Sequence, residues 1–465
     1  MKSLTQDYKI RLLPWLAASA MFMQMLDGSV LNTALPKIAD SFAENPLQMQ
    51  IVVISYLLSV AIFLPIAGWL SDKIGIKKSF LFAITVFTLG SFMCAMSNSL
   101  TMLALSRVLQ GAGGAFLVPI GRLAVLRAYP RSQYANVLSF IVLPALIGPL
   151  IGPTLGGILV QYASWHWIFL INIPVGIICF IATLYLMPHF PDVKTPPFDF
   201  MGLIIVDLAV LCLSVISFTD NIIPGFSNWN FLFFAAAFIA GYYFYARNRA
   251  NSIFDIAMFK IPSFAIGITG NIFIRTVGGA LPFLAPLFFQ TALGFSPSKS
   301  GLAMLPTGVT AMFAKTFVAK LIVKLGYRKF LIANTILLSF FIFCASFIKL
   351  ATPFWTILVI YSFIGMANSL QFTAINALAL IDVPDKYLSG ANNVLSVSFQ
   401  VSISLGVAIA AVLLAKAGSF GFVHSHQNIL LAAFNFTYIA ISVISVISAL
   451  LFLFIPRNAG TKITQ

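Results

Sequence analysis

Long apolar stretches separated by short polar segments run through the whole chain. A membrane-spanning helix needs roughly 20 mostly apolar residues. The sequence contains fourteen such stretches, at residues 13–35, 50–70, 79–98, 100–121, 135–160, 166–187, 201–220, 229–247, 264–289, 300–323, 329–349, 353–380, 390–415 and 430–455. The segments between them are too short for a soluble domain. The pattern therefore predicts an all-α integral membrane protein with fourteen transmembrane helices.

The placement of Lys and Arg residues tests this count. If the N-terminus is cytoplasmic, 20 of the 27 basic residues fall in inner segments and four in outer segments, while Arg107, Arg275 and Lys315 lie within spans. Cytoplasmic loops of membrane proteins carry such an excess of positive charge. The bias persists along the whole chain, whereas an error of one span would have reversed it downstream. Both termini are therefore expected in the cytoplasm.

Composition narrows the class further. The chain is 60% hydrophobic and 8% charged, whereas soluble domains carry roughly 25% charged residues. The net charge of +15 is explained by the cytoplasmic loops, so we expect no nucleic-acid partner. The four cysteines lie in apolar stretches and are expected to pack rather than to bind metal. His424 and His426 are expected to lie in a solvated outer loop, and we expect neither a metal site nor a cofactor.

Asp27 lies inside the first apolar stretch, where a charge is costly and therefore indicates function. The same helix carries Asn32 and is expected to end at Pro36. At 1.5 Å per residue, Asp27 is about 12 Å from the outer end of its span and Arg107 about 10 Å from the outer end of the fourth. The two residues therefore share a level, and we predict a proton-coupling pair. A static buried ion pair is the alternative.

Glycine patterns accompany these charges in the fourth and fifth spans. Gln110 follows Arg107 by three residues and is expected on the same helix face, beside two glycines. The fifth span carries glycines at every fourth position and two Gly-Pro steps, formed by Gly148, Pro149, Gly152, Pro153, Gly156 and Gly157. Such a bare stripe predicts a bent helix packed closely against a partner helix across the pore.

Two short basic turns indicate internal repetition. Residues 68–78 join spans two and three, and residues 324–329 join spans ten and eleven. Each turn contains a glycine and follows the second span of its half. Repeated halves are typical of secondary transporters, so we predict a six-helix bundle over residues 1–190, two linking helices over 191–260 and a second six-helix bundle over 261–465.

Polar residues in the second half could line a pathway through the membrane. They are Asn271 and Arg275 in span nine and Asn368, Gln371 and Asn376 in span twelve. Lys315 lies near enough to the inner surface to extend its ammonium group into water. Asp207 in span seven has no evident partner and is expected to make a structural contact.

The first span carries the feature that points to a family. Residues 26–36 resemble the signature Leu-Asp-x-Thr-x-x-Asn-x-Ala-Leu-Pro, with Ser29 in place of threonine. Residues 103–115 resemble a motif whose arginine is linked to proton transfer, residues 148–157 resemble an antiport motif, and residues 167–176 are similar to a further family stretch. Together these segments resemble the fourteen-span drug–proton antiporters of the major facilitator superfamily along essentially the whole chain.

Residues 68–78 also resemble the gating loop of that superfamily, Gly-x-Leu-x-Asp-Arg-x-Gly-Arg-Lys. Lys73 and Ile76 replace the two arginines, and the positions that match are Gly68, Asp72, Gly75 and Lys77. We expect Asp72 either to close a gate by pairing with a basic residue or to lie solvated in the loop.

The resemblance implies a proton-coupled exporter of drug-like or amphipathic molecules in the bacterial inner membrane, working by alternating access. The expected partners are protons, a small-molecule substrate and membrane lipid, and a monomer is expected. Because the spans carry three cations against two anions, export of an organic anion or an acidic lipid is the alternative. A membrane-embedded enzyme or sensor is the second alternative, although no polar cluster suited to catalysis is evident.

Overall fold

The computed structural model describes residues 2–130, 133–188, 190, 197–215, 228–247, 249, 252–419 and 426–455. The regular structure of these residues is helical. It consists of α1 (Lys2–Phe42), η1 (Pro46–Met49), α2 (Gln50–Phe63), α3 (Ile66–Ile74), α4 (Ile76–Ala95), α5 (Leu100–Ala128), α6 (Tyr134–Tyr162), α7 (Trp167–Leu170), α8 (Asn172–Leu186), α9 (Phe200–Val215), α10 (Asn228–Ala246), η3 (Ile256–Lys260), α11 (Pro262–Leu287), η4 (Phe288–Ala292), α12 (Pro297–Ala314), α13 (Val318–Ala345), α14 (Phe354–Leu380), α15 (Asp385–Ser419), α16 (His426–Leu451) and η5 (Phe452–Phe454).

The helices follow the apolar stretches of the sequence. Within the described residues, nine helices are long and apolar enough to cross a membrane, and α9 and α10 are shorter apolar helices. Each of the fourteen expected ranges overlaps a described helix, while the number of membrane crossings and the side of each terminus stay predictions. His424 lies outside the described residues, as does the side chain of His426.

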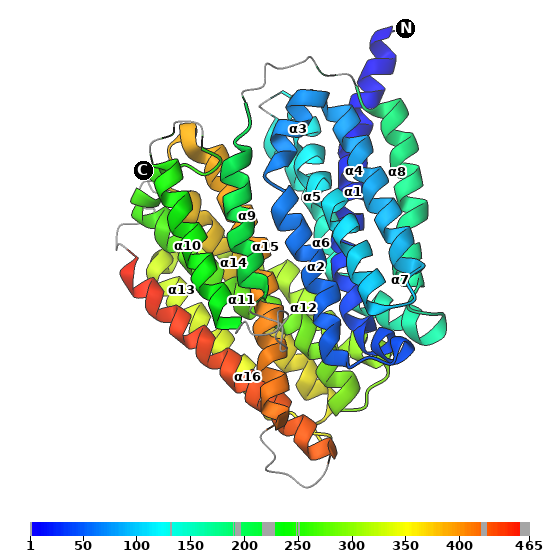
Figure 1. Cartoon of the computed structure of the whole chain (residues 1–465), viewed down its shortest axis with the longest axis vertical. Helices are drawn as coiled ribbons and strands as arrows, with labels where there is room; N and C mark the ends of the chain where they lie inside the picture. Colours follow the sequence, from blue (N-terminus) through cyan, green and yellow to red (C-terminus); the bar gives the residue numbers. More distant parts are fainter. Residues whose placement is uncertain are drawn as a thin grey trace. The chain divides into compact units, whose positions relative to one another are not determined.

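The chain divides into two compact units. Unit 1 comprises residues 1–198 and 296–301, and unit 2 comprises residues 199–295 and 302–465. In Figure 1 the helices of unit 1 run from blue to teal-green, and α5 lies beside both α1 and α4. The helices α9 and α10 belong to the second unit, where the carboxylate of Asp199 accepts hydrogen bonds from the Tyr245 hydroxyl at 2.6 Å and the Ile253 amide at 3.1 Å.

The expected end of the first span at Pro36 is wrong. Helix α1 continues through Pro36 to Phe42. Proline removes one backbone donor, which a membrane helix tolerates when its other contacts hold it. Leu35, Ile38 and Ala39 around this turn are fully buried, so packing preserves the helix beyond the proline.

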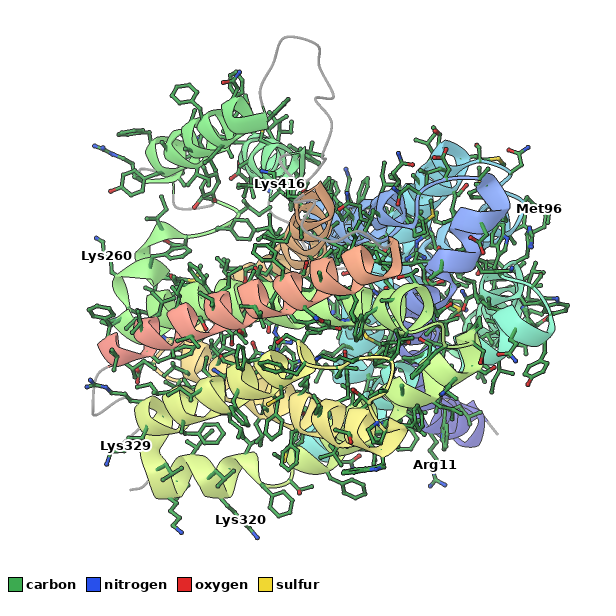
Figure 2. All side chains as sticks on the ribbon, turned by 90° about the horizontal axis from the view of Figure 1, so that it is seen from below. Arg11, Met96, Lys260, Lys320, Lys329 and Lys416 are labelled. Carbon is green, nitrogen blue, oxygen red and sulfur yellow. The ribbon has the colours of Figure 1, made fainter. Side chains whose placement is uncertain are left out.

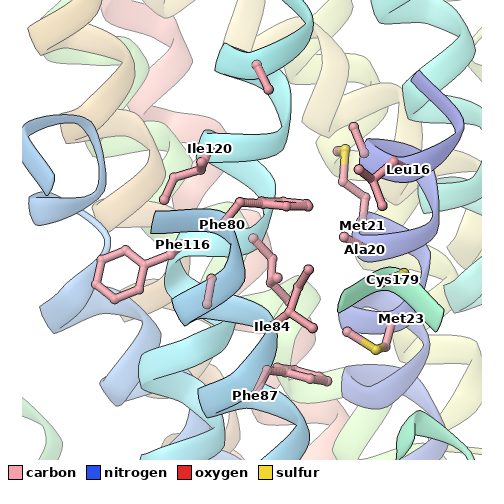
Figure 3. Packing of buried hydrophobic residues seen from close by; sticks show 14 of the residues in the cluster. Leu16, Ala20, Met21, Met23, Phe80, Ile84, Phe87, Phe116, Ile120 and Cys179 are labelled. Carbon is pink, nitrogen blue, oxygen red and sulfur yellow. The ribbon is translucent and has the colours of Figure 1, made fainter. Parts of the chain in front are cut away.

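Apolar side chains from seven helices, α1 to α6 and α8, form the core of unit 1, and Figure 3 shows part of it. Met21 and Met23 come from α1, Phe80 and Phe87 from α4, and Cys179 from α8. All five are buried, and Phe80 and Phe87 have no exposed surface. Methionine and a free thiol fill irregular gaps between helices without hydrogen-bonding demands. This core holds α1 and α4 beside the polar residues described next.

Candidate proton-coupling site

Asp27 of α1 and Arg107 of α5 form a buried ion pair in unit 1. The Arg107 Nη1 atom donates to Asp27 Oδ2 at 2.6 Å, and each side chain is 1% exposed. Arg107 also donates from Nε to the Val52 carbonyl of α2 at 3.3 Å, and its guanidinium lies 4.0 Å from the centre of the Tyr56 ring. An ion pair without water needs such additional partners to offset the cost of desolvation.

The second carboxylate oxygen of Asp27 has its own donors. Gln110 Nε2 donates to Asp27 Oδ1 at 2.8 Å, and Asn172 Nδ2 donates to the same oxygen at 2.9 Å. Gln110 Oε1 in turn accepts from Arg107 Nη1 at 2.7 Å. The helix face shared by Arg107 and Gln110 therefore points at Asp27, as the spacing of the two residues predicted.

The donors around Asp27 bear on its charge state. Both oxygens of Asp27 accept hydrogen bonds from groups that can only donate there, so the arrangement fits an ionised carboxylate. A proton on either oxygen would place a hydrogen against one of these donors and would remove the charge that holds Arg107. Protonation of Asp27 therefore forces the side chains of α1, α5 and α8 to rearrange. Both side chains of the pair are buried from solvent in this conformation.

Sequence reasoning missed two members of the site. Asn172 lies in the family-like stretch 167–176, for which the sequence predicts no role, yet it links Asp27 to the Ser91 hydroxyl of α4, to which its Nδ2 atom donates at 3.1 Å. Tyr56 was not singled out. In the sequence, each of these residues is marked only by a polar group, an amide or a phenol, in an otherwise apolar stretch. The residue that each one faces depends on helix packing, which the sequence does not give.

The glycine stripe of α6 packs against α1, the helix that carries Asp27. A methyl group at Gly148 would come within 2.9 Å of the Leu26 backbone nitrogen, and one at Gly152 would collide with the Ser29 hydroxyl. Ser29 also donates from Oγ to the Gly148 carbonyl at 3.1 Å. The close partner predicted for this stripe is therefore a helix of the same unit.

The C-terminal end of the stripe contacts a second segment in addition to α1. At Gly156 an added methyl group would collide with Thr33 Oγ1 of α1, whereas at Gly157 it would collide with the Pro297 carbonyl. Pro149 and Pro153 lie within the continuous helix α6. The bend expected at these prolines stays a prediction.

The turn between α3 and α4 ties three helices together. Arg127 Nη2 of α5 donates to Asp72 Oδ1 at 2.6 Å, and Lys77 Nζ donates to the Leu184 carbonyl of α8 at 2.6 Å. Gly75 adopts φ 87° and ψ 146°, a region that side chains disfavour, whereas Gly68 faces open space. Asp72 thus pairs with a basic residue of a neighbouring helix.

Neutralising this carboxylate is expected to slow transport more than it affects stability. The Asp72 and Arg127 side chains are 30% and 26% exposed, so Asp72→Asn should lower the free energy of unfolding by less than about 1 kcal/mol. If this ion pair forms in only one state of the transport cycle, its loss shifts the equilibrium between the states by about 1 kcal/mol. The initial transport rate should then fall about fivefold. The charge exchange Asp72→Arg with Arg127→Asp should recover part of the rate, and no recovery would contradict a role for the pair.

Of the remaining predicted pathway residues, Asn32 belongs to unit 1, whereas Asn271, Arg275, Asn368 and Gln371 belong to unit 2. Asn32 is half-buried, and its amide donates to the Gly28 carbonyl of its own helix at 3.5 Å. Gln371 is fully buried between α13 and α14, where Asn334 Nδ2 donates to its Oε1 atom at 2.6 Å. In unit 2, Asn271 Nδ2 donates to Ser398 Oγ at 3.5 Å. A role of these residues in a pathway stays a prediction.

Arg275 of α11 is a buried cation with a different environment from Arg107. It is 7% exposed, and its guanidinium lies 3.5 Å from the centre of the Phe372 ring and 5.2 Å from that of Phe399. Among the described residues, its Nε and Nη2 atoms have no hydrogen-bond partner, and neither does Oδ1 of Asn368 or of Asn376. Cation–π contacts stabilise the guanidinium without neutralising it.

The helices are apolar and long enough to cross a bilayer, and a buried ion pair lies among those of unit 1. These features define a multi-pass membrane protein with charged residues in its interior. The sequence profile of the Major Facilitator Superfamily matches residues 17–281 and 264–464, and the chain belongs to this family. It is therefore a membrane transporter rather than an enzyme, and a multi-pass protein of the inner membrane.

Close relatives cover the whole chain. A protein of Pectobacterium atrosepticum named as a proposed multidrug resistance protein, MdtD, is 42% identical over 98% of this chain and 98% of its own length. A protein of the same name from Serratia proteamaculans is 42% identical over 97% of this chain and 94% of its own length. These relatives span the described and undescribed segments alike.

Solved structures share the fold at low sequence identity. A D-xylose–proton symporter superposes with a TM-score of 0.69 at 15% identity, covering 97% of this chain and 99% of its own. The POT family transporter PepTSo superposes with a TM-score of 0.72 at 13% identity, covering 96% and 97% of the two chains. At these identities the likeness establishes the fold alone.

Proposed function

We propose that the protein is a proton-coupled efflux transporter that exports drug-like or amphipathic small molecules across the bacterial inner membrane by alternating access. The names of the relatives supply the substrate class. The observation that carries proton coupling is the sealed Asp27 carboxylate, which accepts from Arg107, Gln110 and Asn172. Replacing a buried ion pair by apolar residues is often neutral or stabilising, so the fold alone rarely requires such a pair. The presence of this pair in a membrane core therefore favours a function.

The architecture we propose is that of fourteen spans with both termini cytoplasmic. It comprises an N-terminal bundle over residues 1–190, linking helices over 191–260 and a C-terminal bundle over 261–465. The protein works as a monomer in contact with lipid, and its substrates are a small molecule and protons. The basic residues concentrated in the inner segments support this topology.

The mechanism follows from the donors around Asp27. In the conformation described here the ionised carboxylate joins α1 to α5 through Arg107 and to α8 through Asn172. When Asp27 is protonated from the outside, the attraction to Arg107 is lost and the helices separate more easily. Release of the proton to the inside restores the ion pair. Substrate export coupled to this cycle draws its energy from the proton gradient.

Transport by the purified protein in proteoliposomes tests the proposal. With an imposed pH gradient and a fluorescent cationic dye as substrate, we expect dye movement against its gradient together with proton movement in the opposite direction. A protonophore should abolish the dye movement. Dye movement that is unchanged by the protonophore would rule out proton coupling, and no movement of any compound from a broad panel would rule out efflux.

Export of an organic anion is the second candidate, favoured by Arg275. A guanidinium buried at 7% exposure without a carboxylate partner among the described residues would be neutralised by an anionic substrate. Its stacking on Phe372 leaves two nitrogens, Nε and Nη2, with three N–H groups for such a ligand.

Arg275→Gln distinguishes the two candidates. If the substrate is anionic, this change should lower transport of an organic carboxylate at least about tenfold, because a charge-assisted hydrogen bond is worth about 1.5–3 kcal/mol. Arg275→Lys should retain part of the transport, and Lys349→Gln, at an exposed position, serves as the control. If transport of a cationic dye persists in Arg275→Gln and no anion is moved by the wild type, the anionic candidate is wrong.

A further inference from the structure

Unit 2 contains an apolar cavity of about 500 Å³ between α12, α13 and α14. Its lining includes Ala314, Phe317, Leu321, Leu325, Ala333 and Leu370. Phe317 is 56% exposed and Leu325 is 41% exposed, so the cavity opens to the surface of the protein. An exposed apolar surface on membrane-spanning helices is suited to contact with lipid chains.

The repeated turns explain why this cavity exists. Gly326 adopts φ 73° and ψ 156°, close to the φ 87° and ψ 146° of Gly75, so the two turns share one backbone geometry. Twelve residues before these glycines stand Ala314 and Phe63, and seven residues after them stand Ala333 and Phe82. Two phenylalanines of the first half therefore correspond to two alanines of the second.

Helices α5 and α14 correspond in the same way. A methyl group at Gly111 would come within 2.7 Å of the Tyr56 carbonyl, and one at Gly365 would collide with the Thr307 carbonyl. Tyr56 and Thr307 both stand nineteen residues before the glycine of their turn. Five residues after Gly111 and Gly365 stand Phe116 and Leu370.

Three aromatic rings thus occupy in the first half the space that is open in the second. The ring centres of Phe63 and Phe116 are 6.4 Å apart, and those of Phe82 and Phe116 are 6.2 Å apart. Their counterparts Ala314, Ala333 and Leu370 all line the cavity. The cavity lies where these three smaller side chains replace phenylalanines.

The charges around the cavity differ between the halves as well. Residues 315–329 contain five cations and no acid, namely Lys315, Lys320, Lys324, Arg328 and Lys329. Val323, 72% exposed, stands where the first turn has Asp72, three residues before the glycine. The second turn therefore lacks a counterpart of the ion pair between Asp72 and Arg127.

The cations flank the opening of the cavity. Lys320 and Lys324 each follow a lining residue, Phe317 and Leu321, by three positions on the same helix, and are exposed. Figure 2 shows Lys320 and Lys329 extending outward from the ribbon. The carboxylate of Asp382 acts electrostatically on Tyr327 of this turn. The field at the opening is accordingly positive.

We propose that this cavity binds an acyl chain of an anionic phospholipid, whose headgroup phosphate is held by Lys320 and Lys324. The apolar lining provides the site for the chain, and long basic side chains place their charges at the level of the headgroups. The bound chain fills the volume that Phe63, Phe82 and Phe116 fill in the first half. It holds residues 318–325 to α14, where the first half uses an ion pair. The site stands independently of the transported substrate.

Native mass spectrometry of the full-length protein, titrated with phosphatidylglycerol carrying one palmitoyl and one oleoyl chain, tests the proposal. We expect one tightly held lipid, and phosphatidylcholine with the same chains should bind about fivefold more weakly or worse. Lys320→Gln with Lys324→Gln should weaken phosphatidylglycerol about tenfold or more, since each basic residue near an anionic lipid contributes about 1 kcal/mol. Ala333→Phe should weaken both lipids by filling the cavity.

Two matched variants control for general effects. Ile336→Phe adds the same ring on the exposed face of α13, and Lys349→Gln removes a charge elsewhere. Both should bind lipid as the wild type does, and unchanged melting temperatures would show that the Ala333→Phe protein is folded. Unchanged phosphatidylglycerol binding in both test variants would overturn the proposal. Equal affinity for the two lipids would overturn the anionic preference, and displacement of the lipid by a transported dye would instead make the cavity a substrate site.

Discussion

Asp27→Asn is expected to abolish export driven by a pH gradient while leaving exchange of substrate across the membrane intact. The amide is isosteric with the carboxylate but carries no titrating proton, and it leaves Arg107 without its anionic partner. In proteoliposomes, gradient-driven accumulation of dye should fall to background, whereas exchange of labelled for unlabelled dye without a gradient should continue.

The control for this variant lies on the same helix. Asp40→Asn neutralises a carboxylate whose side chain is 67% exposed and whose partner Lys37 is 3.8 Å away, and it should transport as the wild type does. If Asp27→Asn retains gradient-driven accumulation, Asp27 is not the coupling residue. If it loses exchange as well as accumulation, the ion pair stabilises the fold and does not couple transport to protons.

Gly152→Ala is expected to lower the stability of the protein by about 1–3 kcal/mol, the usual cost of overpacking a tight core. Its added methyl group would collide with the Ser29 hydroxyl and come within 2.8 Å of Ser29 Cβ. The helices α1 and α6 would have to separate, which displaces the helix that carries Asp27. Thermal unfolding in detergent should show a lower melting temperature, and proton-driven export should fall with it.

A second substitution distinguishes this clash from a general effect of alanine. Ser29→Gly removes the colliding side chain, so the double variant should recover most of the lost stability, apart from the hydrogen bond from Ser29 to Gly148. Gly28→Ala, one residue away and facing open space, should be neutral or slightly stabilising because alanine favours helix. A double variant as unstable as Gly152→Ala would contradict the assigned contact.

Much of the fold follows from the sequence because a bilayer leaves few alternatives. Backbone groups in lipid must be satisfied within helices, so apolar length alone predicts where helices lie. Depth along a helix is also fixed by the rise per residue, which is why Asp27 and Arg107 could be matched by level. Pro36 was misread because its effect depends on the buried neighbours that hold α1 together.

The members of the site contributed by other helices were beyond sequence reasoning. Asn172 and Tyr56 meet Asp27 and Arg107 only through the rotation of α8 and α2 about their axes, which distant packing decides. The same holds for the glycine stripe, whose regular spacing predicted a close neighbour without saying that it would be α1. The cavity in unit 2 could not be predicted at all, because it depends on which positions of the two halves correspond.

Proton release on substrate binding tests the central claim most directly. Substrate is added to the purified protein in detergent without buffer, near the pH at which transport is half-maximal, and released protons are counted with an indicator dye. If Asp27 exchanges its proton for substrate, the wild type should release about half a proton per bound substrate, because about half of the coupling carboxylates carry a proton at that pH. Asp27→Asn should bind the substrate and release none. Equal proton release by the two proteins would contradict the assignment of Asp27.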